Sequence, residues 1–337
     1  MPPNHQTLTR LVVPLDNSYN NKPNKMKITT KGLFCFAVML LTHQMAFSQT
    51  LKRIELDNKD FFSGHYHVVE PKSDSITGVL VLLAGYGQRA EDTPPETKLH
   101  LEAYKNNILT IFFAAGIKLY ADSITQAQLT AVLEDIINRY KVKTDQFVFG
   151  GFSAGGMIAL RYVELCNEFP DKYPVQPQGV FVVDSPIDFF TIWNQFEETV
   201  ANGTSEIAIE EAVGAMKLIK ADHGDPKENF AFYAHLNPFS MEKKYGENEK
   251  FLKSTAFRAY HDVDISWRLI HRNQTVRHSN YIVTSELINR LLLMGNNRAE
   301  FIQSYQTGYR ANGQRHPHSW SIVDEAECIL WMKGLLK

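Results

Sequence analysis

The residues Gly150–Gly156 read G-G-F-S-A-G-G and contain a G-x-S-x-G pattern around Ser153. A short apolar run precedes the pattern, and apolar residues at helical spacing follow it. This context predicts a sharp strand-to-helix turn, where the serine hydroxyl stands clear of the backbone and can act as a nucleophile. Glycines are needed at positions 151 and 155 because side chains there would collide with the neighbouring strand and helix. A glycine-rich turn that binds phosphate is the alternative interpretation.

With this motif, the chain resembles the α/β-hydrolase superfamily, and more loosely its secreted serine esterase and peptidase-like branches, over about residues 76–337. That family carries its triad in the chain order Ser, Asp or Glu, His. The resemblance implies an α/β fold with a mainly parallel central sheet flanked by helices. It also implies acyl transfer to water through an acyl-enzyme.

Two histidines, His316 and His318, lie in the loop where the resemblance places the catalytic base. They follow the last predicted strand and precede the closing helix. We favour His318, because His316 precedes a proline and is forced into an extended conformation. His318 also borders the helix start, which Ser321 and Asp324 are expected to cap. The sequence assigns surface or hydrogen-bonded core positions to His223, His235, His261, His271 and His278.

The acid that orients this histidine is expected after the penultimate strand, in the run from Tyr260 to Trp267. The base needs a carboxylate on the far side of its ring to hold the tautomer. The resemblance implies an acid followed closely by an apolar side chain, and Asp264 fits this pattern best, with Asp262 as an alternative. Asp184, at the end of the strand after the serine's helix, is a further candidate because some members of this fold keep their acid there. Its other interpretation is a cap for the following helix.

The oxyanion donors are expected in the run from Leu83 to Gln88, which follows a buried strand where the family often has His-Gly-x-Gly. The resemblance implies that the main-chain amides of Tyr86 and Ala154 hold the oxyanion. Ala84 replaces the family's histidine, which mainly orders this loop, so the backbone donors remain. An ordinary glycine-rich turn would look the same in sequence.

Strand-like apolar runs alternate with helix-like stretches from Leu51 onward, which is the pattern of a mainly parallel sheet covered on both faces. The expected strands are 61–69, 78–84, 108–114, 145–149, 179–184, 254–260 and 300–309. The expected helices are 123–140, capped by Asp122 or Ser123, then 157–169 and 322–336.

An insertion is expected between the strand that ends at Asp184 and the strand that begins near Ser254. These ends lie about 70 residues apart, which is more than a single crossover needs. We interpret residues 187–247 as a helical cap, with helices over 188–201 and 206–220. Its aromatic side chains would either shape a partly apolar pocket over the site or be buried in the core, and the sequence leaves both open.

The segment before residue 49 has the features of a secretory signal peptide. Its apolar run, 32–41, is too short to span a bilayer. Lysines precede this run, and the small residues Ala46 and Ser48 follow it as a cleavage site. The sequence therefore predicts a start at Met26, a signal peptide over about 26–48, a domain over 49–337 and a secreted or periplasmic location. A buried core helix is the alternative interpretation.

Composition excludes several classes of protein. A net charge of −2 with scattered Lys and Arg leaves no electrostatic footprint for nucleic acid. Three cysteines exclude a disulfide-rich scaffold and a cysteine-built metal site. No HExxH or comparable spacing occurs, so we expect neither a metal nor a cofactor. Removal of the signal peptide takes away Cys35, and Cys166 and Cys328 could then pair in an oxidising compartment.

The sequence thus predicts a secreted serine hydrolase that cleaves carboxylic esters with Ser153, His318 and Asp264. Its expected partner is a small or oligomeric ester, with no nucleic acid and no membrane span, and the oligomeric state stays open. A serine peptidase of the same fold is one alternative. A non-catalytic protein that keeps the fold for binding is the other.

Overall fold

The structure, a computed structural model, describes residues 49–56, 64–73, 75–203, 206–242 and 247–336. The chain divides into two units, Met1–Ser48 and Gln49–Lys337, and the described residues belong to the second. The predicted signal peptide and Cys35 therefore lie outside the described residues.

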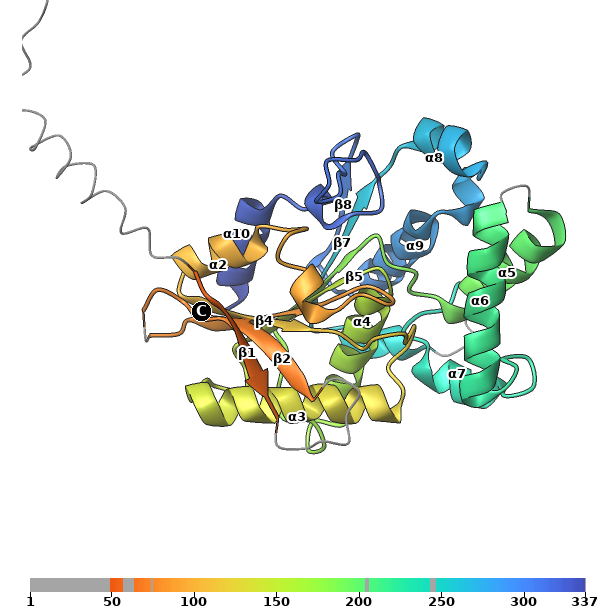
Figure 1. Cartoon of the computed structure of the whole chain (residues 1–337). Helices are drawn as coiled ribbons and strands as arrows, with labels where there is room; N and C mark the ends of the chain where they lie inside the picture. Colours follow the sequence, from red (N-terminus) through yellow and green to blue (C-terminus); the bar gives the residue numbers. More distant parts are fainter. Residues whose placement is uncertain (1–48, 57–63, 74, 204–205, 243–246, 337) are drawn as a thin grey trace, which may run out of the picture. The chain divides into compact units, whose positions relative to one another are not determined.

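The strands of the described residues form one eight-stranded sheet, in the order β1-β2-β4-β3-β5-β6-β7-β8 (Figure 1). Their bounds are β1 Leu51–Glu55, β2 His65–Val69, β3 Gly78–Leu83, β4 Ile108–Phe113, β5 Phe147–Phe152, β6 Gly179–Val183, β7 Ala256–Asp262 and β8 Ala299–Ser304. The pairs β1–β2 and β2–β4 are antiparallel, and all other neighbouring pairs are parallel. The predicted α/β class with a mainly parallel sheet is confirmed.

The central strands are buried on both faces. Every residue of β3, β4, β5 and β6 is buried, which explains their almost continuous apolar sequences. The expected strand 61–69 corresponds to β2, although residues 61–63 lie outside the described part. The strand expected over 300–309 is too long, because β8 ends at Ser304. The sequence analysis missed β1, since LKRIE is short, charged and partly exposed.

Helices cover both faces of the sheet. They are α2 Leu99–Lys105, α3 Ser123–Tyr140, α4 Ala154–Glu168, α5 Phe189–Asn202, α6 Glu206–His223, α7 Phe230–Leu236, α8 Ile265–Arg272, α9 Asn280–Leu293 and α10 Glu325–Leu335, with short 3-10 turns η1 Ala90–Asp92, η3 Asn248–Leu252, η4 Val276–His278 and η5 Trp320–Ile322. One buried cluster joins the sheet to α3, α4 and α9, and another joins it to α2 and α10. Figure 1 shows α2 and α10 together above the sheet and α3 below it. None of the described helices has the length and hydropathy needed to cross a membrane.

The helix caps agree with the sequence at one helix and differ at another. Asp122 caps α3 by accepting a hydrogen bond from a first-turn amide at 2.8 Å, as predicted. At α10 the cap is Asp324, and the expected partnership with Ser321 is wrong. Ser321 lies within η5, ahead of the helix, and its hydroxyl instead forms hydrogen bonds with the main chain of Tyr309.

The region 187–247 contains α5, α6 and α7, and its aromatic side chains form a buried cluster of their own. Phe189, Trp193 and Tyr233 pack there with Met157 of α4. The rings of Phe189 and Tyr233 stack with centroids 4.6 Å apart. Most of the large aromatics of this region are therefore buried in a core of their own, whereas Phe230 is exposed. Helix α6 packs against α5 and presents its other side to the main body of the fold.

A buried arginine joins the serine's helix to this insertion. Arg161 of α4 is completely buried, and its Nε donates to the carbonyl oxygen of His235 in α7 at 2.8 Å. Its terminal nitrogens lie 3.3 Å from Glu164 and 3.2 Å from Glu168. Burial raises the pKa of the Glu164 carboxyl, and the guanidinium acts against that rise. This contact makes the position of α4 depend on α7.

We expect Arg161→Met to lower the free energy of unfolding by about 3 kcal/mol, because it leaves Glu164 buried beside no cation. Chemical denaturation of the variant and the wild type measures the loss. Arg139→Met is the matched control, since Arg139 pairs with Asp135 at 3.0 Å on the surface and should contribute less than about 1 kcal/mol. Equal losses in the two variants would contradict a special role for the buried pair.

The two described cysteines are both free and buried. Cys166 in α4 and Cys328 in α10 belong to clusters on opposite faces of the sheet. The disulfide that the sequence allowed is therefore wrong, because the sheet separates the two thiols. Burial raises the pKa of the Cys328 thiol to about 12, and that of Cys166 rises for the same reason.

Candidate active site

Ser153 sits at the junction of β5 and α4 in a backbone conformation that side-chain-bearing residues rarely adopt. Its φ is 54° and its ψ is −127°. Its amide donates to the carbonyl oxygen of Val183 at 3.0 Å, and its own carbonyl accepts from Gly156. A conformation of this kind costs of order 1–3 kcal/mol and persists only where its surroundings fix it. The predicted strand-to-helix turn at Ser153 is confirmed.

The glycines on either side of the serine make this turn possible. A Cβ on Gly151 would lie 2.3 Å from the carbonyl oxygen of Gly155. A Cβ on Gly155 would lie 2.3 Å from the carbonyl oxygen of Ala84 and 2.4 Å from that of Leu83. These contacts are with main chain, which cannot move aside, so the predicted reason for both glycines is confirmed.

His318 and Asp184 form a short contact at the same end of the sheet. Nδ1 of His318 lies 2.6 Å from Oδ2 of Asp184, which directly follows β6. The His318 ring packs on Phe152, the residue before the serine, with centroids 4.5 Å apart. A carboxylate can only accept, so Nδ1 carries a proton, and in the neutral ring Nε2 then has the lone pair. That is the tautomer that a general base needs.

Asp264, which the sequence analysis expected to orient the histidine, is engaged elsewhere. Its Oδ1 accepts from the amide of Trp267 and caps α8, and its Oδ2 lies 2.9 Å from Arg315. Asp262, the other alternative, accepts from the amides of Gln306 and Gly308, both at 2.8 Å. These aspartates hold the loop that carries His318. The structure therefore brings Asp184 to the histidine, and not Asp264 or Asp262.

His316 has a supporting position in the same loop. Its Nδ1 accepts from the main-chain amide of His318 at 3.1 Å, and its ring meets Trp267 edge-on. Burial lowers the pKa of His316 to about 3, with further contributions from the nearby His318, Arg310 and Arg272. The ring is thus neutral at pH 7, and it fixes the backbone of His318.

A second histidine, His261, contacts the other carboxylate oxygen of Asp184. Nδ1 of His261 lies 3.0 Å from Oδ1 of that carboxylate, and Nε2 lies 2.7 Å from the hydroxyl of Thr284. His261 is buried in β7 and stacks on Phe301. Burial disfavours the charged carboxylate, but the hydrogen bonds from His261 and His318 outweigh it and hold the pKa of Asp184 well below its usual range.

The predicted oxyanion loop follows β3. The amide of Gly85 donates to Oε1 of Gln88 at 2.8 Å, and the amide of Gly87 donates to the carbonyl oxygen of Gly116 at 2.8 Å. Within the described part of the chain, the amides of Tyr86 and Ala154 donate to no protein group. Both are therefore available to a bound oxygen. The side chain of Gln88 orders the loop in which Ala84 replaces the family's histidine.

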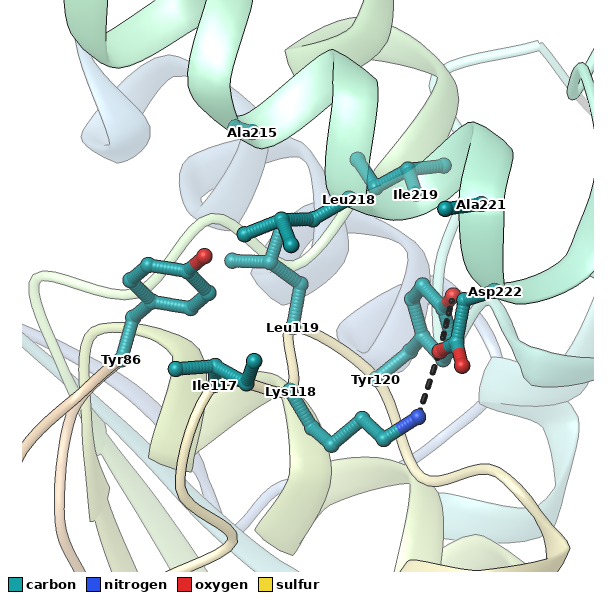
Figure 2. Close-up of a pocket in the computed structure, with 10 residues that line it drawn as sticks. All are labelled: Tyr86, Ile117, Lys118, Leu119, Tyr120, Ala215, Leu218, Ile219, Ala221 and Asp222. Carbon is teal, nitrogen blue, oxygen red and sulfur yellow. Dashed lines mark hydrogen bonds and ion pairs between the residues drawn. The ribbon is translucent and has the colours of Figure 1, made fainter.

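A cavity of about 200 Å³ lies beside Tyr86, between the loop 117–120 and α6 (Figure 2). Its aliphatic lining comes from Ile117, Leu119, Leu218 and Ile219. At one end Lys118 pairs with Asp222 of α6 and lies 2.9 Å from Asp122. The insertion thus supplies one wall of an apolar cavity next to the oxyanion loop, through the aliphatic side chains of α6.

Comparison with known proteins gives a likeness at the level of structure. No protein-family model matches the sequence, and no curated protein matches it at a significant level. A carboxyl esterase 2 from the fungus Tuber melanosporum is similar with a TM-score of 0.53 and 17% identity, over 87% of this chain and 90% of that one. MPT51 (FbpC1) from Mycobacterium tuberculosis has a TM-score of 0.57 and 10% identity, over 86% and 99%. An esterase/lipase from an uncultured bacterium has a TM-score of 0.53 and 11% identity, over 93% and 94%.

The fold is the α/β-hydrolase fold. Within it, the sequence motifs located Ser153, His318 and the loop of Tyr86, while two supporting residues were missed. Gln88 belongs to no motif, although its place three residues after the first loop glycine is a usable signal. His261 was assigned to the hydrogen-bonded or surface histidines, and its hydrogen bond to Asp184 depends on side-chain direction in β7.

The pH dependence of stability tests the contact between His261 and Asp184. A carboxyl whose pKa is lowered in the folded state stabilises that state above its unfolded pKa of about 3.9, and this contribution is lost as the pH falls. His261→Phe removes one donor and keeps the stacking on Phe301. We expect it to lower the free energy of unfolding by about 2 kcal/mol at pH 7. The loss should be clearly smaller at a pH below the lowered, folded-state pKa of Asp184 than at pH 7.

Denaturant unfolding at the two pH values measures this effect. His271→Phe is the control, because His271 is exposed and has no contact with Asp184, and we expect it to behave as the wild type. A loss in His261→Phe of the same size at both pH values would mean that His261 acts through packing alone.

Proposed function

We propose that this protein is a serine hydrolase that cleaves carboxylic esters, with Ser153 as nucleophile, His318 as general base and Asp184 as its orienting acid. The observation that carries the proposal is the 2.6 Å contact between His318 Nδ1 and Asp184 Oδ2, beside the strained turn at Ser153. Strained nucleophile turns and buried acid–base pairs are typical of catalytic sites.

The first half of the proposed reaction acylates Ser153. Its Oγ attacks the ester carbonyl carbon while Nε2 of His318 takes the hydroxyl proton. The carbonyl π electrons move to oxygen, and the amides of Tyr86 and Ala154 donate to the oxyanion. When the carbonyl re-forms, the alcohol leaves with the proton from His318. Nδ1 of His318 keeps its proton throughout, and Asp184 accepts the hydrogen bond from it and stabilises the imidazolium.

The second half hydrolyses the acyl-enzyme. Water attacks the acyl carbon and gives its proton to His318. When the second oxyanion collapses, Oγ of Ser153 is the leaving group and takes the proton back from His318. The carboxylic acid then departs. Acid, alcohol and free enzyme are the products, and water is the only co-reactant that the cycle consumes.

Esters are favoured over amides because the same groups must expel a poorer leaving group from an amide. The cavity of about 200 Å³ beside Tyr86 suits a small apolar acyl or alcohol group. Similar structures include proteins named as esterases, which agrees with the proposal. A serine peptidase of the same fold is the alternative reaction.

Hydrolysis of p-nitrophenyl esters of increasing chain length, together with labelling by a fluorophosphonate, tests the nucleophile. We expect the wild type to hydrolyse the short esters and take one label, and Ser153→Ala to do neither. Ser185→Ala is the matched control, because Ser185 is buried and its hydroxyl contacts the carbonyl oxygens of Gly151 and Val183. A wild type that takes no label would overturn the proposal in favour of a binding protein.

A pair of conservative variants separates the two acid assignments. We expect Asp184→Asn to lower kcat about 10⁴-fold, because an amide no longer fixes the tautomer of His318. Asp264→Asn should change kcat less than about tenfold and act mainly on thermal stability, since it weakens the contact with Arg315. The reverse ranking of kcat would return the acid role to Asp264.

We also propose that the protein is exported from the cytoplasm. The signal peptide predicted over about 26–48 lies outside the described residues, and the proposed secreted or periplasmic location depends on it.

A further inference from the structure

Three potential metal ligands converge on the side of the fold that carries β2. His65 and His67 stand two residues apart in this strand, so both side chains leave the same face of the sheet. Glu91 of η1 faces them, and its Oε2 lies 3.9 Å from Nδ1 of His67. One ligand atom from each of the three residues lies within 4.8 Å of the other two. The two imidazole rings meet edge-on.

The facing atoms of this cluster are buried and lack partners. His67 is only 7% exposed. Among the described residues, neither its Nδ1 nor Oε2 of Glu91 has a hydrogen-bond partner. Buried polar atoms are paired in the great majority of cases, and each unpaired one costs about 1–3 kcal/mol. Two such atoms that face each other need a third group between them.

An ion pair between protonated His67 and Glu91 does not explain the arrangement. Nδ1 of His67 and Oε2 of Glu91 lie 3.9 Å apart, which is too far for a hydrogen bond. Arg89 lies 3.4 Å from Oε1 of Glu91, so Oε2 remains directed at the histidine. Arg53, opposite His67 in β1, is itself paired with Glu55.

We propose that His65, His67 and Glu91 bind a divalent transition-metal cation of the zinc type. Two imidazoles and one carboxylate are a donor set that zinc accepts, whereas magnesium and calcium prefer oxygen ligands alone. Bonds of about 2.1 Å at tetrahedral angles place ligand atoms about 3.4 Å apart, so His67 and Glu91 need to approach by only about half an ångström.

A cavity of about 280 Å³ adjoins the cluster and gives the cation a path and room for a fourth ligand. His65 and Glu91 line it together with Gly87 and Gln88 of the oxyanion loop. A cation here fastens η1 to β2 next to that loop. The site is separate from the Ser153 machinery and does not depend on the proposed ester hydrolysis.

Another cluster, formed by Asp122, Asp222 and His223, has similar spacing but a different charge balance. Lys118 already contacts both of its carboxylates. An ammonium ion therefore occupies the place of a metal cation there. This cluster supplies the matched control.

Zinc binding by the untagged full chain tests the proposal. After treatment with EDTA and its removal, titration with zinc chloride is followed by calorimetry, and thermal melting is recorded with and without zinc. We expect one zinc ion per chain and a higher melting temperature. His67→Ala and Glu91→Gln should weaken binding at least about tenfold and remove the shift in melting temperature. His223→Ala should bind as the wild type does.

Circular dichroism of Glu91→Gln, a partly exposed position, establishes that lost binding is not lost folding. Absence of stoichiometric zinc binding by the wild type would overturn the proposal. So would undiminished binding by a folded Glu91→Gln, or loss of binding in His223→Ala, which would move the cation to the other cluster.

Discussion

The negative charge of Asp184 is buried, and two imidazoles, one from a strand and one from a loop, stabilise it there. His318 reaches it from the loop after β8, and His261 reaches it from β7. The main chain of Asp184 is fixed as well, because its amide donates to Tyr260 and its carbonyl accepts from Asn280 of α9. Removing any one partner leaves a charge with too few donors in a medium that solvates it poorly. The positions of β6, β7, α9 and the histidine loop therefore depend on one carboxylate.

A second constraint acts on the other side of the site, through close contact of main chains. Gly155 of α4 leaves no space for a side chain against the carbonyl groups of Leu83 and Ala84. The same contact that holds the strained turn at Ser153 places the end of β3 beside it. This packing also fixes the start of α4 against the loop that carries Tyr86, the two segments to which we assign the proposed oxyanion donors.

The sequence predicts the parts of this structure that depend on local pattern. Continuous apolar runs locate the buried strands, and the glycines around Ser153 locate the turn. Sequence alone could not tell which carboxylate contacts His318, because Asp184, Asp262 and Asp264 all stand at strand ends. Asp184 has a positive φ, whereas Asp262 and Asp264 both pair with Arg315. These features distinguish the three aspartates, and they depend on tertiary structure. The spacing of apolar residues along the sequence carries no information about these tertiary features.

The contacts of Gln88 and His261 escape sequence analysis for a similar reason. Each is a single polar side chain whose partner lies on another residue's backbone or on another strand. Strand β1 was missed because its alternation is short and its exposed side chains are charged. The disulfide between Cys166 and Cys328 was allowed by composition, and the sheet between them forbids it.

The burial of those two thiols on opposite faces has a consequence for how the protein can be handled. The described part of the chain contains no disulfide bond that a reductant could break. Both thiols are also protonated at neutral pH, because burial raises their pKa values, and so they react slowly with oxidants. The stability of this part of the chain should therefore not depend on the redox potential of its surroundings.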